Sequence, residues 1–180
     1  MKISISGTAA SGKSTIAKKV AEKLGFKHFS MGDFQREIAR EKGVTISELG
    51  KIEADDKSID EMVDNKQIEI GKREKEFVID SRLGTYFIPD SIKIFVDAAL
   101  ETRAQRRFLQ KQSEESFKSK SDAMRDILKR EEINRKRFIK YYGFDFFDMH
   151  HYDLIIDTTN LTIEDAAEKI IEHALASRNN

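Results

Sequence analysis

The segment Gly7–Ser14, which reads Gly-Thr-Ala-Ala-Ser-Gly-Lys-Ser, constrains the fold of this 180-residue chain more than any other feature. It matches the phosphate-loop pattern G-x-x-x-x-G-K-[ST], in which two glycines let the backbone curl until several N–H groups face one anion. The loop follows the apolar run Ile3–Ser6 and precedes a helix expected from Lys13 to about Leu24. The N-terminal end of that helix carries partial positive charge. This order of elements predicts a nucleoside triphosphate site.

Three side chains provide the chemistry expected around a bound triphosphate. The Lys13 ammonium would lie near the β- and γ-phosphates, and the Ser14 hydroxyl is a ligand for Mg²⁺. Asp80 ends another apolar run, Phe77–Asp80, and an acid in that place commonly holds Mg²⁺ directly or through water. The alternative for Asp80 is a turn acid that caps the end of a strand. We expect Ser14 and Asp80 to hold the metal.

Short apolar runs recur along the chain and predict buried parallel strands. They are Ile3–Ser6, Lys27–Ser30, Phe77–Asp80, Lys93–Asp97 and Leu154–Asp157. Each is followed by helical sequence or by a loop leading to a helix, and capping boxes at Thr45–Glu48 and Thr162–Asp165 mark two helix starts. This alternation predicts an α/β fold of three layers, the P-loop NTPase fold, with a five-stranded parallel sheet and flanking helices.

Two stretches depart from the alternation of strand and helix within a single predicted domain, residues 1–180. Residues from about 31 to 75 are mostly helical and carry no strand signal, so we expect a helical insertion that binds the acceptor. The polar stretch within about 109–125 interrupts two long arginine-rich helices, and we expect a short lid there. The alternative for the second stretch is an ordinary solvated loop.

Composition excludes several classes of protein. The 32 basic and 32 acidic residues give a formal net charge of zero, which argues against a nucleic-acid binder held by bulk electrostatics. The absence of cysteine excludes a disulfide framework and a thiolate metal site. No apolar run approaches 18 residues, and Met1 leads directly into a strand. We therefore expect a cytoplasmic protein, interpreted as a monomer, that binds neither nucleic acid nor a membrane.

Motifs of the other phosphate-loop classes are incomplete. A GTPase switch would show N-K-x-D, but Asn65–Ile68 lacks the acid, and it would show D-x-x-G, but Asp80–Leu83 lacks the glycine. A motor ATPase normally needs more chain. A small-molecule kinase remains, in which an insertion and a lid close over two anionic substrates and exclude water.

Arginines support a kinase, because phosphoryl transfer brings many negative charges together. Arg82 directly follows a predicted strand, at the carboxyl edge of the sheet where ligands bind. Arg130, Asn134 and Arg137 share one face of a helix, from which guanidinium groups can grip phosphate oxygens. The alternatives are a surface ion pair for Arg82 and a solvated helical face for the other three. Arg106 and Arg107 share this ambiguity and rank lower.

Several segments together resemble the cytidylate kinase family, most closely its short, archaeal-type branch. They are Gly32–Arg36, Asp80–Gly84, Lys93–Ala98, Arg103-Ala104, Arg130–Arg137 and Tyr152–Thr158. The resemblance covers nearly the whole chain. It implies in-line transfer of the γ-phosphate of ATP to CMP or dCMP with Mg²⁺, giving ADP and CDP or dCDP, and a role in pyrimidine nucleotide metabolism.

The resemblance also implies roles for individual residues. ATP would bind to Gly7, Thr8, Ala9, Ala10, Ser11, Gly12, Lys13, Ser14 and Thr15. The residues implied to act in catalysis are Lys13, Arg82 and Arg137. CMP would bind to Asp33, Arg36, Asp60, Asp64, Gln67, Arg82, Arg130 and Asn134. Within that set Asp60, Asp64 and Gln67 would recognise the base, and the alternative for these three is ordinary polarity of a helix surface.

The chain departs from the family pattern in three places. Thr8-Ala9-Ala10 stands where many relatives carry prolines or glycines, and Asn134 stands where an acid is common. Longer bacterial relatives have Gly-Arg-Asp in place of Ser81-Arg82-Leu83, so base specificity here must come from elsewhere.

Two other functions remain open from the sequence. One is a kinase for UMP, AMP or a small metabolite, although an adenylate kinase would show D-G-[FY]-P-R at Asp80–Leu83. The other is a regulatory protein that binds ATP without acceptor-dependent turnover.

Overall fold

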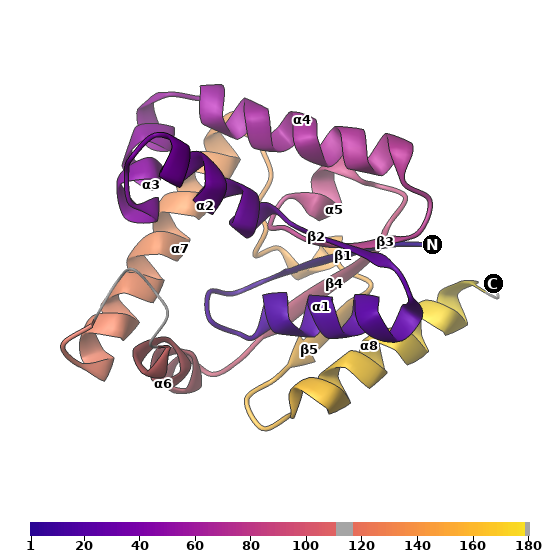
Figure 1. Ribbon diagram of the computed structural model, residues 1–180. Coiled ribbons are helices and arrows are strands. Elements are labelled where there is room, and N and C mark those ends of the chain that lie inside the picture. The colour runs from indigo at the N-terminus through magenta and orange to yellow at the C-terminus, as the bar shows by residue number, and fades with distance from the viewer. Residues whose placement is uncertain (111–116, 179–180) are drawn as a thin grey trace.

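The computed structural model describes residues 1–110 and 117–178, which form one parallel sheet with helices on both faces (Figure 1). The strands are β1 (Lys2–Gly7), β2 (Lys27–Ser30), β3 (Phe77–Asp80), β4 (Ile92–Asp97) and β5 (Leu154–Asp157). Their order across the sheet is β2-β3-β1-β4-β5, and every neighbouring pair is parallel. The predicted five-stranded parallel sheet is confirmed, with each strand boundary within one residue of the prediction.

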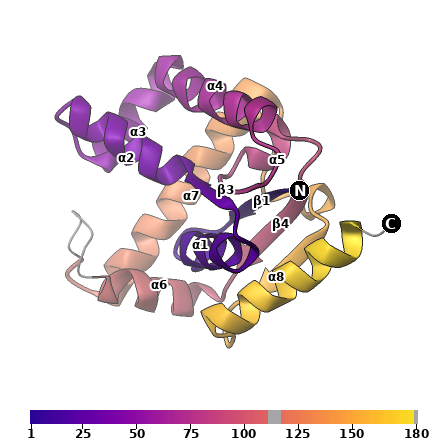
Figure 2. The same ribbon diagram turned by 45° about the vertical axis from the view of Figure 1, so that its right-hand side comes forward.

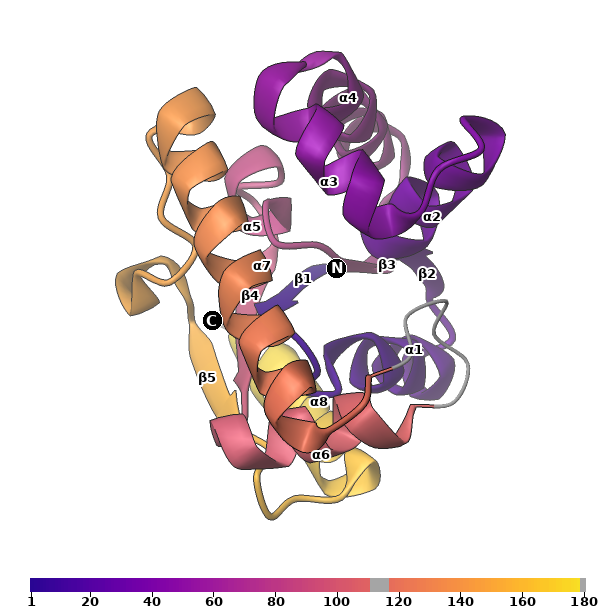
Figure 3. The same cartoon turned by 90° about the vertical axis from the view of Figure 1, so that its left-hand side faces the viewer.

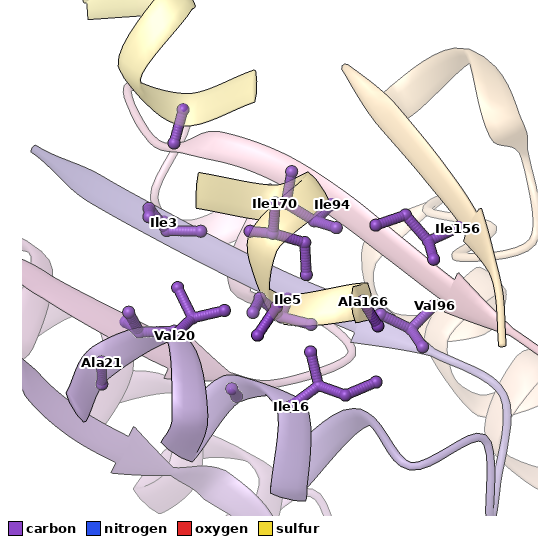
Figure 4. Packing of buried hydrophobic residues seen from close by; sticks show 14 residues of the cluster. Ile3, Ile5, Ile16, Val20, Ala21, Ile94, Val96, Ile156, Ala166 and Ile170 are labelled. Atoms are coloured by element: carbon purple, nitrogen blue, oxygen red, sulfur yellow. The ribbon is translucent and has the colours of Figure 1, made fainter. Parts of the chain in front are cut away.

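One face of the sheet is covered by α1 (Lys13–Leu24) and α8 (Ile163–Arg178). Alternate residues of a strand point to opposite faces, and Ile3 and Ile5 of β1 join Val78 of β3 in the cluster under these two helices. Figure 4 shows this cluster, to which β1, β4, β5, α1 and α8 all contribute side chains. Its apolar burial fixes α1, and with α1 the loop that precedes it.

The other face carries the helical insertion and the longest helix. The insertion consists of α2 (Met31–Glu41), α3 (Ile46–Asp55) and α4 (Ser58–Arg73), which pack on Phe77 and Ile79 of β3. The remaining elements are α5 (Gly84–Phe87), α6 (Leu100–Leu109), α7 (Lys120–Tyr142) and the 3₁₀ helix η1 (Met149–His151). In Figures 2 and 3, α7 runs from α6 toward the insertion. Its Phe138 packs with Phe95 of the sheet and Phe146.

Both predicted capping boxes start helices. The Thr45 hydroxyl accepts from the Glu48 N–H at 3.2 Å, and Glu48 accepts from the Thr45 N–H at 2.8 Å. At α8, the Asp165 N–H donates to the Thr162 hydroxyl at 3.1 Å, and the Asp165 carboxylate accepts from the Thr162 N–H at 3.4 Å. Each box satisfies N–H groups that a helix start otherwise leaves without partners.

The predicted lid, about 109–125, is only partly covered by the described residues. Helix α6 ends at Leu109 and α7 begins at Lys120, so residues 120–125 of this stretch are helical. Residues 111–116 lie outside the described part of the chain, and the lid stays a prediction there. Across residues 1–110 and 117–178, no helix combines the length and apolar character needed to cross a membrane.

The central strand depends on complete burial of its isoleucines. Ile5 is 0% exposed, whereas Ile155 on the edge strand β5 is 50% exposed. We expect Ile5→Ala to lower the free energy of unfolding by about 2–5 kcal/mol, since the loss of buried methyl groups adds to the cost of a cavity. The matched change Ile155→Ala should cost less than about 1 kcal/mol. Urea denaturation measures both, and equal losses would contradict this account of the core.

Candidate active site

The phosphate loop sits at the carboxyl end of β1 and has the backbone conformation that its glycines allow. Gly7 has φ 155°, and a Cβ built on it would lie 2.1 Å from the carbonyl oxygen of Val96. Gly12 has φ 93° and precedes α1, with no side-chain cap on the helix. The N–H groups at the start of α1 are therefore left for another partner, and helix N-termini of this kind bind anions. Ala10 adopts φ 62°, which is strained for a residue with a Cβ.

Side chains from β4, α6, α7 and the segment after β5 hold the loop from outside. The Thr8 hydroxyl donates to Asp97 at the end of β4 at 2.7 Å, and the Ala9 N–H donates to Glu131 of α7 at 2.7 Å. The carbonyl of Ser11 accepts from Thr158, just after β5, at 2.8 Å and from Arg106 of α6 at 3.0 Å. These contacts fix the loop in shape without using the N–H groups at the start of α1.

Sequence reasoning missed most of this support. The sequence predicted no role for Glu131, which also accepts from Arg103 of α6 at 2.8 Å. Arg106 ranked below the arginines that were given roles. Asp97 and Thr158 had no predicted role at the loop, although Asp97 ends a predicted strand and both residues lie in segments that resemble the family. A usable signal was present, because both residues directly follow or end buried strands, and the carboxyl ends of parallel strands gather at one edge of the sheet.

The predicted phosphate lysine and the predicted metal ligand lie together. The Lys13 ammonium forms an ion pair with Asp80, whose side chain is 1% exposed. Ser14 and Thr15 are exposed in the first turn of α1. A hydroxyl and a carboxylate are hard oxygen donors, and Mg²⁺ commonly uses one or two protein ligands together with substrate phosphates. Ser14 and Asp80 therefore fit this ion by the chemistry of their donors.

Arg82 lies just past β3 with its guanidinium 5.9 Å above the ring of Phe146. Its Nε is buried and has no hydrogen-bond partner among the described residues. Burial, and then the charge of Arg130, lower the pKa of Arg82 to about 10. A buried donor without a partner is costly, and a cation in this state favours an anion beside it. The surroundings contradict the alternative of a surface ion pair.

Arg137 is buried, at 5% exposure, between α7 and the insertion. It forms an ion pair with Glu53 of α3, and its Nε lies 3.4 Å from Asp60 of α4. Glu53 also accepts from Gln35 of α2 at 2.9 Å and was missed in the sequence. The alternative of a solvated helical face is wrong for Arg137. Arg130 and Asn134 are half-buried on the same helix.

The three predicted base-recognition residues point inward from α4. Asp60, Asp64 and Gln67 are 3%, 8% and 1% exposed, so they are not ordinary surface polarity. Burial raises the pKa of Asp60 to about 7 and the pKa of Asp64 to about 6. Asp64 accepts from the Tyr142 hydroxyl at 2.5 Å, and Gln67 accepts from the Ser81 hydroxyl at 2.5 Å.

Asp33 and Arg36, predicted to bind the acceptor, pair with each other in the first turns of α2. Their side chains are 69% and 54% exposed. The structure therefore brings these two together in solvent, and their contact with a substrate stays a prediction.

Comparison with known sequences shows the family to which the chain belongs. The model of the cytidylate kinase-like family matches residues 2–160. Cytidylate kinase of Sulfurisphaera tokodaii is 37% identical over 174 residues, which are 96% of this chain and 93% of that protein. Cytidylate kinase of Pyrococcus furiosus is 39% identical over 158 residues, covering 87% and 79%. Shikimate kinase from Bacteroides thetaiotaomicron has a TM-score of 0.68 over 96% of this chain and 97% of that chain, at 17% identity, which supports the fold alone.

The raised pKa of Asp60 makes stability depend on pH. With a pKa of about 7 instead of 3.8, the folded protein keeps a proton that the unfolded chain releases. The free energy of unfolding therefore falls as pH rises from about 4 to 7. We expect Asp60→Asn to remove this slope and to be most stabilising, relative to wild type, at pH 8. Asp64→Asn should act likewise over about pH 4 to 6. Urea unfolding from pH 4.5 to 8 measures both, and curves parallel to wild type would contradict the assigned burial.

Proposed function

The chain belongs to the cytidylate kinase-like family, and from this premise we propose that it transfers the γ-phosphate of ATP to CMP or dCMP. The observation that carries the proposal is the buried arginine pair Arg82 and Arg137. Arg82 is close enough to Asp80 at the donor side, and to Arg130 and Arg137 on α7, for their charges to shift its pKa. Arg137 in turn contacts the insertion. The guanidinium groups of Arg82 and Arg137 therefore lie between the phosphate loop and the proposed acceptor site.

On the donor side, ATP would bind along the proposed residues Gly7–Thr15. The triphosphate would receive the N–H groups of the loop and of the first turn of α1. Lys13 would exchange its partner Asp80 for phosphate oxygens. Mg²⁺, held by Ser14 and Asp80, would neutralise charge on the phosphates.

On the acceptor side, Arg82, Arg130 and Arg137 would hold the monophosphate of CMP, with Asn134 beside them on α7. Asp60, Asp64 and Gln67 would face the base, and Asp33 and Arg36 complete the proposed set. The attacking phosphate oxygen is anionic near neutral pH, so this step needs no strong general base. Lys13, Arg82 and Arg137 stabilise the charge that develops on the transferred group, and closure over the site keeps water out.

We propose a monomer as the working unit. We propose that it acts in the cytoplasm on nucleotides of pyrimidine metabolism. The balanced charge, 32 basic against 32 acidic residues, supports small-molecule nucleotides over nucleic acid as partners.

Acceptor specificity tests the proposed function directly. We expect ADP release from ATP–Mg²⁺ to be stimulated by CMP and dCMP, and not by UMP, AMP, GMP or the absence of an acceptor. Turnover with UMP or AMP alone would favour the kinase with another acceptor. ATP binding without any acceptor-dependent turnover would favour the regulatory protein.

The role of Arg137 is separable from that of its neighbours on α7. Arg137→Ala should lower kcat by roughly 10³-fold, on the scale of other arginines that stabilise phosphoryl transfer, with ATP affinity changed only a few fold. The matched control is Arg135→Ala, because Arg135 is exposed and pairs with Asp145 at the surface. Steady-state kinetics and ATP titration measure both variants. A kcat within a few fold of wild type for Arg137→Ala would contradict the catalytic role.

A further inference from the structure

Two polar side chains on the inward face of α4 are each held by a hydroxyl group from another element. Gln67 is held by Ser81, which follows β3, and Asp64 is held by Tyr142, the last residue of α7. Gln67 and Asp64 stand one helical turn apart, so their side chains are neighbours. The two hydroxyl groups decide which hydrogen-bonding atoms of this pair remain for a ligand.

Ser81 orients the amide of Gln67. The Ser81 oxygen accepts from the Leu83 N–H at 3.2 Å, and its single hydrogen is donated to Oε1 of Gln67 at 2.5 Å. With Oε1 engaged, Gln67 offers its Nε2 hydrogens, so it acts as a donor. A flipped amide would place N–H groups against the Ser81 hydroxyl, which would then lose the acceptor for its own hydrogen.

Tyr142 orients Asp64 so that this residue acts as an acceptor, whereas Gln67 acts as a donor. The hydroxyl donates its only hydrogen to Oδ2 of Asp64 at 2.5 Å, which leaves Oδ1 as an acceptor. Burial, reinforced by Asp64, raises the pKa of Tyr142, so the phenol keeps its hydrogen at neutral pH. The third carboxylate of the face, Asp60, is turned toward Arg137. The pair left for a base is therefore one acceptor, Asp64, beside one donor, Gln67.

This order of donor and acceptor matches one pyrimidine and opposes the other. Cytosine presents the N4 amino group as a donor beside the N3 acceptor. Uracil presents the O4 acceptor beside the N3–H donor, so both positions are reversed. Cytosine would donate to Asp64 and accept from Gln67, whereas uracil would set an acceptor against the carboxylate and a donor against the amide N–H. Sites built on such pairs reject the mismatched ligand because buried polar groups are left unpaired.

We propose that Ser81 and Tyr142 are positioning residues that fix the polarity of Gln67 and Asp64 and so select cytosine over uracil. The inference rests on the proposed function for the presence of a nucleotide at this site. It assigns the orientation of Gln67 to the Ser81 hydroxyl and the orientation of Asp64 to the Tyr142 hydroxyl.

The test compares binding of CMP and UMP, by calorimetry, to wild type and to Ser81→Ala, Ser81→Thr and Ser91→Ala. Ser91 is the matched control, because it is also a buried serine, and its hydroxyl donates to the Ile88 carbonyl and is hydrogen-bonded to the Ser4 hydroxyl. We expect Ser81→Ala to reduce the CMP-to-UMP affinity ratio at least tenfold, since Gln67 is then free to flip. Ser81→Thr, which keeps the hydroxyl, should stay within about threefold of wild type, and Ser91→Ala should leave the ratio unchanged. A wild-type ratio retained in Ser81→Ala overturns the proposal.

A second variant tests the proposal independently in case Ser81→Ala does not fold. Gln67→Glu has nearly the same shape but replaces the free donor by an acceptor, so its ratio should move toward UMP. An unchanged ratio in that variant also overturns the proposal. Turnover assays on the same proteins separate the two hypotheses. If the wild-type protein binds CMP more tightly than UMP but transfers no phosphate, the kinase function is refuted and the base selection is supported. If the wild-type protein is an active kinase but binds CMP and UMP equally, the kinase function is supported and the base selection is refuted.

Discussion

The phosphate loop can offer its N–H groups to an anion only if other parts of the chain hold its shape. Gly12 begins α1 without a side-chain cap, unlike Thr45 at α3. Gly7 lets the loop lie close against β4, because a Cβ there would contact the Val96 carbonyl, and the Thr8 N–H donates to that same carbonyl at 3.1 Å. Contacts from Asp97, Glu131, Arg106 and Thr158 replace the bonds that a regular element would supply. The central place of β1 in the sheet brings those residues within reach of one loop.

A second constraint follows from charge. The proposed site gathers several cations, and in the structure carboxylates hold them in the pairs Lys13–Asp80, Arg137–Glu53 and Arg103–Glu131. Buried pairs of this kind contribute little net stability, because desolvation offsets attraction, but loss of one partner is costly. In the proposed reaction, substrate phosphates and Mg²⁺ would take over some of these partners. The Arg103–Glu131 pair differs, since Glu131 also holds the Ala9 N–H and so supports the loop itself.

The sequence predicted what depends on local pattern and missed what depends on the direction of one side chain. Apolar runs predicted all five strands of the described sheet, and the spacing of Arg130, Asn134 and Arg137 predicted one shared helix, which is α7. Glu131 and Glu132 show the limit. They are adjacent and identical, yet Glu131 is buried against the loop while Glu132 is exposed and pairs with Lys136. A step of about 100° around a helix decides between them, and only the packing of α7 sets that angle.

Helix α7 links the two halves of the proposed site mechanically. It carries Glu131 at the phosphate loop and Arg137 at the insertion, and these two residues are separated by about 9 Å along one continuous helix. A rigid-body shift of α7 that frees Arg137 from Glu53 would also displace Glu131 from Ala9. In the proposed reaction, an acceptor phosphate that takes Arg137 from its carboxylates would therefore change the support of the donor loop. The buried charges on α7 thus give a physical reason for the two substrates to affect each other's binding.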